Sequence, residues 1–577
     1  MINKMKTNQK KLLILASLSF LVASSLFAGV NDKGIEYYRA ELYGAAKIFF
    51  LAQTNQSPAD QAENYYYLGE TYYKLNQEDS ASYYYQKAVD ILPDYPFGYI
   101  GAGKLALKKG DAKAADDLLK KANGLAKKDP SVQTAIAEVY ANVGDYANAQ
   151  LALDKARKIN SKYSGIYLVE GDMLMKQGKT GDACARYDNA ILFNNSDKVS
   201  YLKLAQVYKD INSDESLKYL DKLIALDPNY IPAFAVYGDI YREKAQIKNA
   251  LDAYEKFISI PGVPLLQQER YAQLLYFWAS SNPSIAAEEF PKALKQIQYV
   301  LSKDPTNLVM KRLQAYNNFR LGNFEEGYKQ MVEFLKEMPK ERHIYQDYMT
   351  LGQLALKEKQ PNEALDAFEK AIQMDSTKSS DIYKQSAIAA SNAGLYPAAV
   401  NYYQKYIAVD KDADANDYNS YATVCYKAAA YYIDPANEAS VTTPDSIAAY
   451  EASFKYFVQK GDSAYAEVAR RFPDKHYGYI GRANINSLLD KYDIDRTGKM
   501  KGYAKPFFEE AITVMLKNNA DGARNADIIA AYRYLVNYYL AVENNTEAVI
   551  DFSKKILDID PNDEAARKTL TMLKVKY

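Results

Sequence analysis

Residues 62–95 place apolar and small side chains in two runs of helical spacing, separated by a polar turn. In the first run four such residues lie three or four positions apart, on one face of a helix: Tyr65, Leu68, Gly69 and Tyr72. The second run has Ala81, Tyr85 and Ala88 at the same spacing. Pro93 ends it, because proline lacks the helix hydrogen-bond donor and its ring clashes with the preceding turn. The pattern predicts two antiparallel helices that cross at the small residues Gly69 and Ala81.

The same arrangement recurs along most of the chain. The counterparts of Gly69 in the next five units are Gly103, Ala137, Gly171, Ala205 and Gly238. A shortened unit comes first, and its second helix is marked by Ala45, Phe49 and Ala52. Residues 265–307 depart from the pattern, and we expect Pro283 and Pro291 to interrupt the turn between two helices there. Regular spacing resumes after residue 307.

This pattern resembles the tetratricopeptide repeat. The signature of that family has aromatic, Leu-Gly, Tyr, Ala, aromatic, Ala and Pro residues at fixed offsets, and residues 62–95 match each of them: Tyr65, Leu68, Gly69, Tyr72, Ala81, Tyr85, Ala88 and Pro93. The resemblance implies an all-α fold, a solenoid of about thirteen antiparallel helix pairs wound into a right-handed superhelix. Because the repeat is a scaffold, the resemblance names no reaction.

The repeats divide the chain into seven segments. We expect a signal peptide at 1–28, an N-terminal partial repeat at 29–60, a regular array at 61–264, a degenerate repeat at 265–307, a second array at 308–413, repeats with loop insertions at 414–562 and a C-terminal capping helix at 563–577. The insertions are the loops 433–444 and 490–500. A polar cap is needed because the last repeat would otherwise expose its apolar face.

The N-terminus has the composition of an export signal. Lysines at 4, 6, 10 and 11 precede an apolar run at 12–26, and Phe27-Ala28-Gly29 offers a small-residue cleavage site. The run is shorter than the ~20 residues of a spanning helix, so we expect no transmembrane anchor after signal cleavage. An exported chain without a framework of paired cysteines suggests a bacterial periplasm. The alternative is an uncleaved signal anchor that holds the chain at the periplasmic face of a membrane.

Charge and composition exclude several classes of function. Lys plus Arg and Asp plus Glu both number 72, so no basic excess exists to attract nucleic acid. Cys184 and Cys425 lie about seven repeats apart, too far to pair in a solenoid whose repeats touch only their neighbours. Neither they nor His343 and His476 have the setting of a metal or catalytic site. With no phosphate loop or nucleophile elbow present, we expect no cofactor and no enzymatic activity.

Candidate binding residues are those that the repeat does not need for packing. Tyr66, Glu70 and Tyr73 do not recur, and the register places them on the inner, concave face that the family uses for ligands. A second candidate is a helix face with aromatic and guanidinium groups, which could hold an acidic or sugar-bearing partner: Arg312, Tyr316, Phe319 and Arg320. The family's chaperone-tail site, with Lys and Asn in consecutive repeats, is not matched.

Two local motifs remain open. Asp493, Asp495, Thr497 and Gly498 look like the start of a calcium loop, but the twelfth position is Ala504 instead of a bidentate Glu. Three Asp-Ser pairs, at Ser80, Ser446 and Ser463, resemble a bacterial O-glycosylation signal, although Asp-Ser is also ordinary helix-capping chemistry. The expected function is a scaffold that binds protein partners in the bacterial cell envelope. The alternative is a glycan- or peptidoglycan-binding module that uses the surplus tyrosines of the groove.

Overall fold

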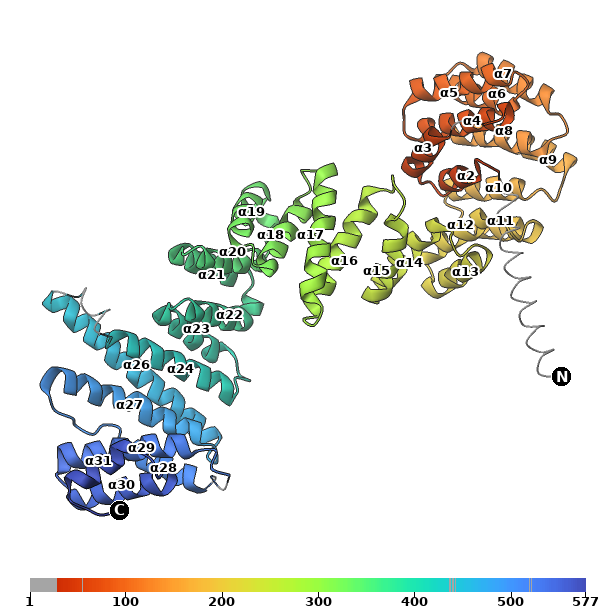
Figure 1. Cartoon of the computed structure of the whole chain (residues 1–577). Coiled ribbons are helices and arrows are strands. Elements are labelled where there is room, and N and C mark those ends of the chain that lie inside the picture. The colour runs from red at the N-terminus through yellow and green to blue at the C-terminus, as the bar shows by residue number, and fades with distance from the viewer. Residues whose placement is uncertain are drawn as a thin grey trace, which may run out of the picture. The chain divides into compact units, whose positions relative to one another are not determined.

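The computed structural model describes residues 29–53, 56–434, 437, 441, 443–517, 519 and 521–577. Within these ranges helices make up all the regular secondary structure and no strand occurs, so the all-α fold is confirmed (Figure 1). The predicted signal peptide at 1–28 lies outside the described residues. The chain forms two compact units, 1–317 and 318–577. No helix of the described part is long and apolar enough to span a membrane.

The first unit consists of antiparallel helix pairs in chain order. Its helices are α2 Asp32–Arg39, α3 Tyr43–Ala52, α4 Pro58–Lys74, α5 Glu78–Ile91, α6 Pro96–Lys108, α7 Ala112–Leu125, α8 Pro130–Asn142, α9 Tyr146–Ile159, α10 Ser164–Lys176, α11 Thr180–Phe193, α12 Lys198–Lys209, α13 Ser213–Leu226, α14 Ile231–Glu243, α15 Ile247–Ile258, α16 Leu265–Ser281 and α17 Ala286–Lys303. The boundary between the units falls within α18, Leu308–Leu321.

The second unit continues the pairing with longer helices. It contains α19 Phe324–Glu337, a 3-10 turn at Lys340–Arg342, α20 Tyr345–Lys357, α21 Pro361–Met374, a 3-10 turn at Ser376–Lys378, α22 Ser379–Asn392, α23 Tyr396–Val409, α24 Ala415–Tyr432, α26 Pro444–Arg471, α27 His476–Thr497, α28 Lys505–Lys517, α29 Asn525–Tyr538, a π-helical turn at Tyr539–Glu543, α30 Thr546–Ile559 and α31 Glu564–Met572. The last of these is the predicted terminal helix.

The predicted packing register is confirmed in the regular repeats. Ala81, Ala88 and Ala149 are completely buried. A Cβ on Gly69 would lie 2.6 Å from the ring of Tyr85, so only glycine lets these two helices approach so closely. The turns are equally specific: Gly110 and Gly144 have φ values of +82° and +80° and directly precede the aspartates that cap α7 and α9. Sequence thus fixes both the helix crossings and the helix starts.

Three local predictions are wrong. In the first pair the fully buried residues are Ala46 and Phe50, while Ala52 is exposed, so the true register is one residue later. Pro291 lies inside α17 and does not interrupt a turn; that turn ends before Ala286. The expected loop at 490–500 is helical through Thr497, because α27 continues to a left-handed Gly498.

The first unit also closes upon itself. The pair α2–α3 shares one apolar cluster with α12 to α15, although some 150 to 220 residues separate them in sequence. Tyr37, Leu42 and Phe50 belong to this cluster together with Tyr230 and Phe257. In a plain solenoid each repeat contacts only its neighbours, so this closure is additional to the repeat pattern.

Candidate functional site

The inner face of the first unit carries one charged or polar residue directly after each small crossing residue. Glu70 follows Gly69 on α4, and its side chain is almost fully buried. Its carboxylate accepts hydrogen bonds from Tyr38 at 2.7 Å and Tyr85 at 2.8 Å. Lys104 of α6 pairs with both carboxylate oxygens, at 2.6 and 2.5 Å. Glu70 therefore joins three helix pairs and has little surface left for a partner.

The same carboxylate–tyrosine–cation triad recurs twice in the unit. Asp172 follows Gly171; it accepts a 2.7 Å hydrogen bond from Tyr187 and pairs with Lys203 at 2.9 Å. Asp239 follows Gly238; it accepts hydrogen bonds from Tyr254 and from Arg270. In each triad the tyrosine comes from the second helix of the same repeat and the cation from the first helix of the next one. The triads tie neighbouring repeats together along the inner face.

The identity of the second-helix residue decides whether a triad forms. Where leucine replaces the tyrosine, no hydroxyl reaches the inner face. Leu119 and Leu153 occupy this place in the repeats of Lys104 and Glu138. Within the first unit, a glycine-acid pair followed fifteen residues later by tyrosine is therefore the sequence signal of the triad. That signal is present at Glu70, Asp172 and Asp239, and the interpretation of Glu70 as a free groove residue overlooked it.

Glu138 is the exception on this face. It occupies the same place as Glu70, two repeats later, but its side chain is exposed and it forms no ion pair or hydrogen bond with a described residue. Although solvent reaches the Glu138 side chain, desolvation by the protein around it raises its pKa. The carboxylates of Glu70 and Asp172 add to this shift, and Lys104 and Arg39 oppose it. Arg39 of α2 is likewise exposed and forms no ion pair within the described chain. Both side chains are exposed to solvent, and the neighbouring Tyr67 hydroxyl raises the pKa of Arg39.

The pKa of Glu70 moves in the opposite direction. Burial acts to raise the pKa of this carboxyl, but the Lys104 ammonium and the hydrogen bonds from Tyr38 and Tyr85 outweigh it and hold the pKa below its usual value. Glu70 is therefore charged at neutral pH and serves as a structural anion. The two glutamates at equivalent positions thus have contrasting roles.

The surplus tyrosines of the first full repeat pack mainly against one another. Tyr66 is buried among Tyr67, Tyr95 and Phe97, with ring centroids 5.0 to 6.3 Å apart. Tyr73 is half-buried and lies beneath the ammonium groups of Lys104 and Lys108, 5.3 and 5.0 Å from its ring. Of the predicted trio Tyr66, Glu70 and Tyr73, only Tyr73 keeps appreciable exposure.

The second predicted set lies on α18 but is divided between the two compact units. Tyr316 is buried and contacts Tyr276, with ring centroids 6.2 Å apart, and Arg312 is half-buried. Phe319 packs against Phe324 at 6.1 Å, and Arg320 is exposed. Two of the four side chains thus contribute to packing, a role that helical spacing alone does not distinguish from binding.

The residues that could take part in catalysis or bind a metal, His343 and the two cysteines, are buried within the fold. His343 is buried between the Tyr348 hydroxyl and the Met338 carbonyl, each 2.9 Å away. Cys184 and Cys425 are buried free thiols, and burial raises the pKa of both. No cluster of three potential metal ligands occurs among the described residues.

The candidate calcium loop is also explained by the fold. Asp493 and Asp495 lie on helix α27, and Lys501 pairs with Asp493 at 3.0 Å. Asp490 organises the following loop: its carboxylate accepts hydrogen bonds from the backbone N–H groups of residues 501 to 504 and from Tyr534. The segment is a carboxylate-anchored turn that positions α28.

The serines of the three Asp-Ser pairs have different surroundings. Ser446 bonds within the cap of α26, Ser463 donates to a backbone carbonyl of that helix, and Ser80 is half-buried.

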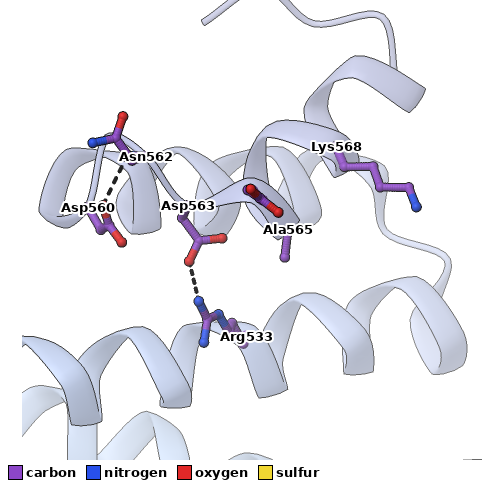
Figure 2. Close-up of a pocket in the computed structure, with 7 residues that line it drawn as sticks. Arg533, Asp560, Asn562, Asp563, Ala565 and Lys568 are labelled. Atoms are coloured by element: carbon purple, nitrogen blue, oxygen red, sulfur yellow. Dashed lines mark hydrogen bonds and ion pairs between the residues drawn. The ribbon is translucent and has the colours of Figure 1, made fainter.

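An open pocket of about 500 Å³ lies near the C-terminus (Figure 2). Its lining includes Arg533, Asp560, Asp563 and Lys568. Arg533 pairs with Asp563, and Asp563 also caps α31 through the Ala566 N–H at 2.9 Å. The Arg533–Asp563 pair and the Asp563 cap hold α31 in place, so the pocket is part of the C-terminal cap.

Comparison with known proteins identifies repeats of one family. Residues 62–95 and 348–378 each match a tetratricopeptide repeat model. A DnaJ homolog subfamily C member 7 homolog from Schizosaccharomyces pombe is 22% identical over 338 residues, which cover 56% of this chain and 59% of the relative. The match thus spans less than two thirds of that relative's length.

Solved structures similar to this chain include two bacterial repeat proteins. The C-terminal part of a TPR repeat-containing protein from Cytophaga hutchinsonii is 20% identical, with 52% of this chain and 98% of that chain covered and a TM-score of 0.36. A tetratricopeptide repeat protein from Parabacteroides merdae is 13% identical, with 51% and 98% covered and a TM-score of 0.24.

Proposed function

We propose that this protein is a non-enzymatic scaffold that binds a protein partner on the inner face of its first unit. Tetratricopeptide repeat proteins generally mediate protein–protein interactions, and residues 62–95 and 348–378 match this repeat. The observation that carries the proposal is that the charged residues of the inner face fall into two groups. The triads hold the helices in place, while Arg39 and Glu138 remain exposed there without an ion pair to the described chain.

The charges on the two residues favour a polypeptide over a simple ion. Arg39 and Glu138 have opposite charge and lie within electrostatic range of each other. A peptide segment can present both an acidic and a basic side chain, and complementary charges provide specificity and orientation more than bulk affinity. A rigid surface also lowers the ordering cost of binding. Glycan binding has weaker support, because the rings of Tyr66 and Tyr84 already pack against other aromatic rings.

The cell envelope is the proposed location. The basic and apolar residues of 1–28 support export, and the small number of cysteines suits a periplasm. The partner would then be an envelope protein, and an uncleaved anchor is the alternative. Fractionation with an antibody to the native protein tests this part separately.

Photo-crosslinking in the native cell tests the binding surface. A photoreactive amino acid at Glu138 is expected to capture a defined protein, and the Glu138→Lys variant is expected to lose that partner in co-purification. The matched control is Lys113→Glu, a charge reversal of an exposed residue on α7 of the neighbouring repeat. Equal partner recovery from both variants would reject the inner face as the binding surface. A glycan-array signal lost in Glu138→Lys would favour the glycan alternative.

A further inference from the structure

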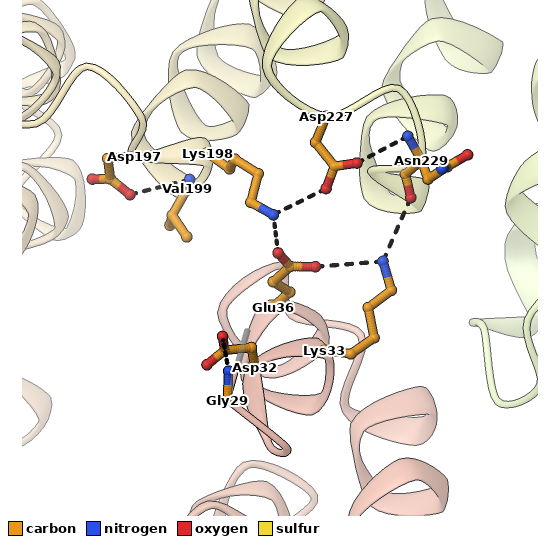
Figure 3. A network of polar contacts seen from close by, with 9 residues as sticks. All are labelled: Gly29, Asp32, Lys33, Glu36, Asp197, Lys198, Val199, Asp227 and Asn229. Carbon is orange, nitrogen blue, oxygen red and sulfur yellow. Dashed lines mark hydrogen bonds and ion pairs between the residues drawn. The ribbon is translucent and has the colours of Figure 1, made fainter. Parts of the chain in front are cut away.

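The closure of the first unit has a polar seam. Lys198 of α12 pairs with Glu36 of α2 and, at 2.9 Å, with Asp227 (Figure 3). Lys33 of α2 donates to the backbone carbonyl of Asn229 at 3.5 Å. The side chains of Lys198, Glu36 and Asp227 are between 18% and 27% exposed, so water can replace much of this interaction. Ion pairs with this much exposure are weaker than fully buried ones, and the apolar cluster of α2–α3 with α12–α15 lies beside them.

The seam also has a contact between two backbones. Gly44 of α3 lies directly against Gly262, in the turn between α15 and α16. A Cβ added to Gly44 would lie 2.2 Å from the Gly262 carbonyl oxygen. Gly44 is the second residue of α3, and a helix prefers alanine to glycine. The local helix therefore does not require this glycine, whereas the seam does.

The pair α2–α3 packs on its neighbour α4 through buried side-chain hydrogen bonds and stacked aromatic rings. The buried Asn64 side chain donates to the Phe50 carbonyl at 3.2 Å, and Tyr38 bonds to Glu70. The rings of Phe50 and Tyr67 stack with centroids 6.0 Å apart. These contacts are those of successive repeats in a solenoid. If the ring opens, we therefore expect the opening at the seam and not between α3 and α4.

The seam leaves a buried polar group unsatisfied. Tyr230 is completely buried beside Lys198, whose ammonium lies 5.3 Å from its ring. Its hydroxyl has no hydrogen-bond partner within the described chain. A buried donor without a partner is destabilising, and opening the seam would give this hydroxyl access to water. This cost lowers the free-energy difference between the closed and open ring.

The two sides of the seam meet around the proposed binding surface. Arg39 of α2 and Lys203 of α12 both lie within electrostatic range of Glu138 on α8. The inner face is therefore enclosed between the start and the end of the first unit. A bulky partner that approaches Glu138 from the side of the seam must pass this closure.

We propose that the seam between α2–α3 and α12–α15 is a gate that controls access of a partner segment to the inner face of the first unit. The inference rests on the proposed function of that face. In the closed state the shared apolar cluster, the ion pairs of Lys198 and the Gly44–Gly262 contact hold α2–α3 against α12–α15. In the open state α2–α3 stays on α4, and an extended peptide enters through the separated seam.

Thiol labelling of the full chain measures this access without a partner. Glu138→Cys places a thiol on the inner face, and its reaction with N-ethylmaleimide is compared with that of a 5-kDa polyethylene glycol maleimide. Lys113→Cys, exposed on α7, corrects for the intrinsic rates of the two reagents. The native Cys184 and Cys425 are buried, and the chain without added cysteine gives their background.

The same measurement is repeated with Gly44→Ala, which opens the seam, and with Gly124→Ala as the matched control. Gly124 also lies in a helix, α7, but a Cβ there would meet no atom within 4 Å. We expect the corrected rate of the bulky reagent at position 138 to be about tenfold or more below that of the small one, because only the open fraction reacts. Gly44→Ala is expected to abolish this difference and Gly124→Ala to leave it unchanged.

The outcomes separate the gate from the proposed function. Equal corrected rates for both reagents in the parent chain would overturn the gate, as would a difference that Gly44→Ala does not reduce. Neither result depends on partner binding. Conversely, a working gate combined with failure of the Glu138 photo-crosslink would reject the proposed binding function and leave the gate standing.

Discussion

The buried pair Glu70–Lys104 provides the sharpest test of what the inner face does. We predict that Glu70→Gln destabilises the first unit, because it leaves the Lys104 ammonium buried, 3% exposed, without its anion. Breaking one partner of a buried ion pair costs about 3–5 kcal/mol. The remaining amide oxygen still accepts one hydrogen bond, so we expect a loss of about 3 kcal/mol. A residue that only contacted a partner would change stability by less than about 0.5 kcal/mol.

A double-mutant cycle isolates the pair. Glu70→Gln/Lys104→Met removes both charges and replaces the ammonium with an apolar side chain of similar length. The double variant is expected to be more stable than Glu70→Gln alone, with a coupling energy of about 2 kcal/mol. Because long repeat arrays need not unfold in one step, the measurement is hydrogen exchange of peptides from α4 and α6 at pH 7. A loss below about 0.5 kcal/mol for Glu70→Gln, or additivity of the two changes, would refute the structural role.

The pH dependence of this stabilisation has a definite sign. The folded pKa of Glu70 is lowered, so its contribution is fully present above the unfolded pKa of about 4.3 and declines as the pH falls toward the folded value. The exchange protection of α4 should therefore decrease in acid in the parent chain and change less in Glu70→Gln. Equal acid sensitivity of the two proteins would contradict this assignment.

Further predictions concern other single side chains. Glu138→Gln makes the same change at the equivalent position. It should leave the stability of the first unit unchanged or raise it slightly at neutral pH, because folding raises the pKa of Glu138. A loss of stability as large as that of Glu70→Gln in the same exchange assay would contradict the unpaired state of Glu138. Tyr187→Phe should cost about 1–2 kcal/mol through its hydrogen bond to Asp172, as measured by exchange in α10, and no change would remove this triad. Ala149→Leu should overpack a fully buried crossing and cost about 1–3 kcal/mol, and an unmoved thermal midpoint would disprove the register. Asp490→Asn should increase exchange at residues 501–504, whose N–H groups its carboxylate holds; unchanged exchange would show that the turn does not need the charge.

The repeat architecture could be predicted from the sequence because the features that produce it are local. Helical spacing, the glycine at each close crossing and the capping aspartates each act within one repeat. The errors have the same origin. The register of the first pair failed because Phe49 and Phe50 are adjacent and similar. Both rings lie against Gly34, and only the cluster formed with the later helices buries Phe50 fully and leaves Phe49 partly exposed.

The candidate site was predicted only in part. The sequence pointed to the inner face, and Glu70 does lie on it, but its partners Tyr38 and Lys104 come from other repeats. A list of positions cannot show that a charge is already paired. In each of the three triads a tyrosine lies fifteen residues after the acid, and this spacing was available as a signal because it follows the repeat geometry.

Sequence by itself determined the helices, their pairing and the positions that turn inward, because these depend on residues within about one repeat of each other. Only the tertiary structure decided which inward charges are paired, that Glu138 and Arg39 stay exposed without an ion pair to the described chain, and that α2–α3 meets α12–α15. The closure depends on the sum of small rotations over several repeats. No single residue encodes that sum, so it becomes visible only when the first unit is complete.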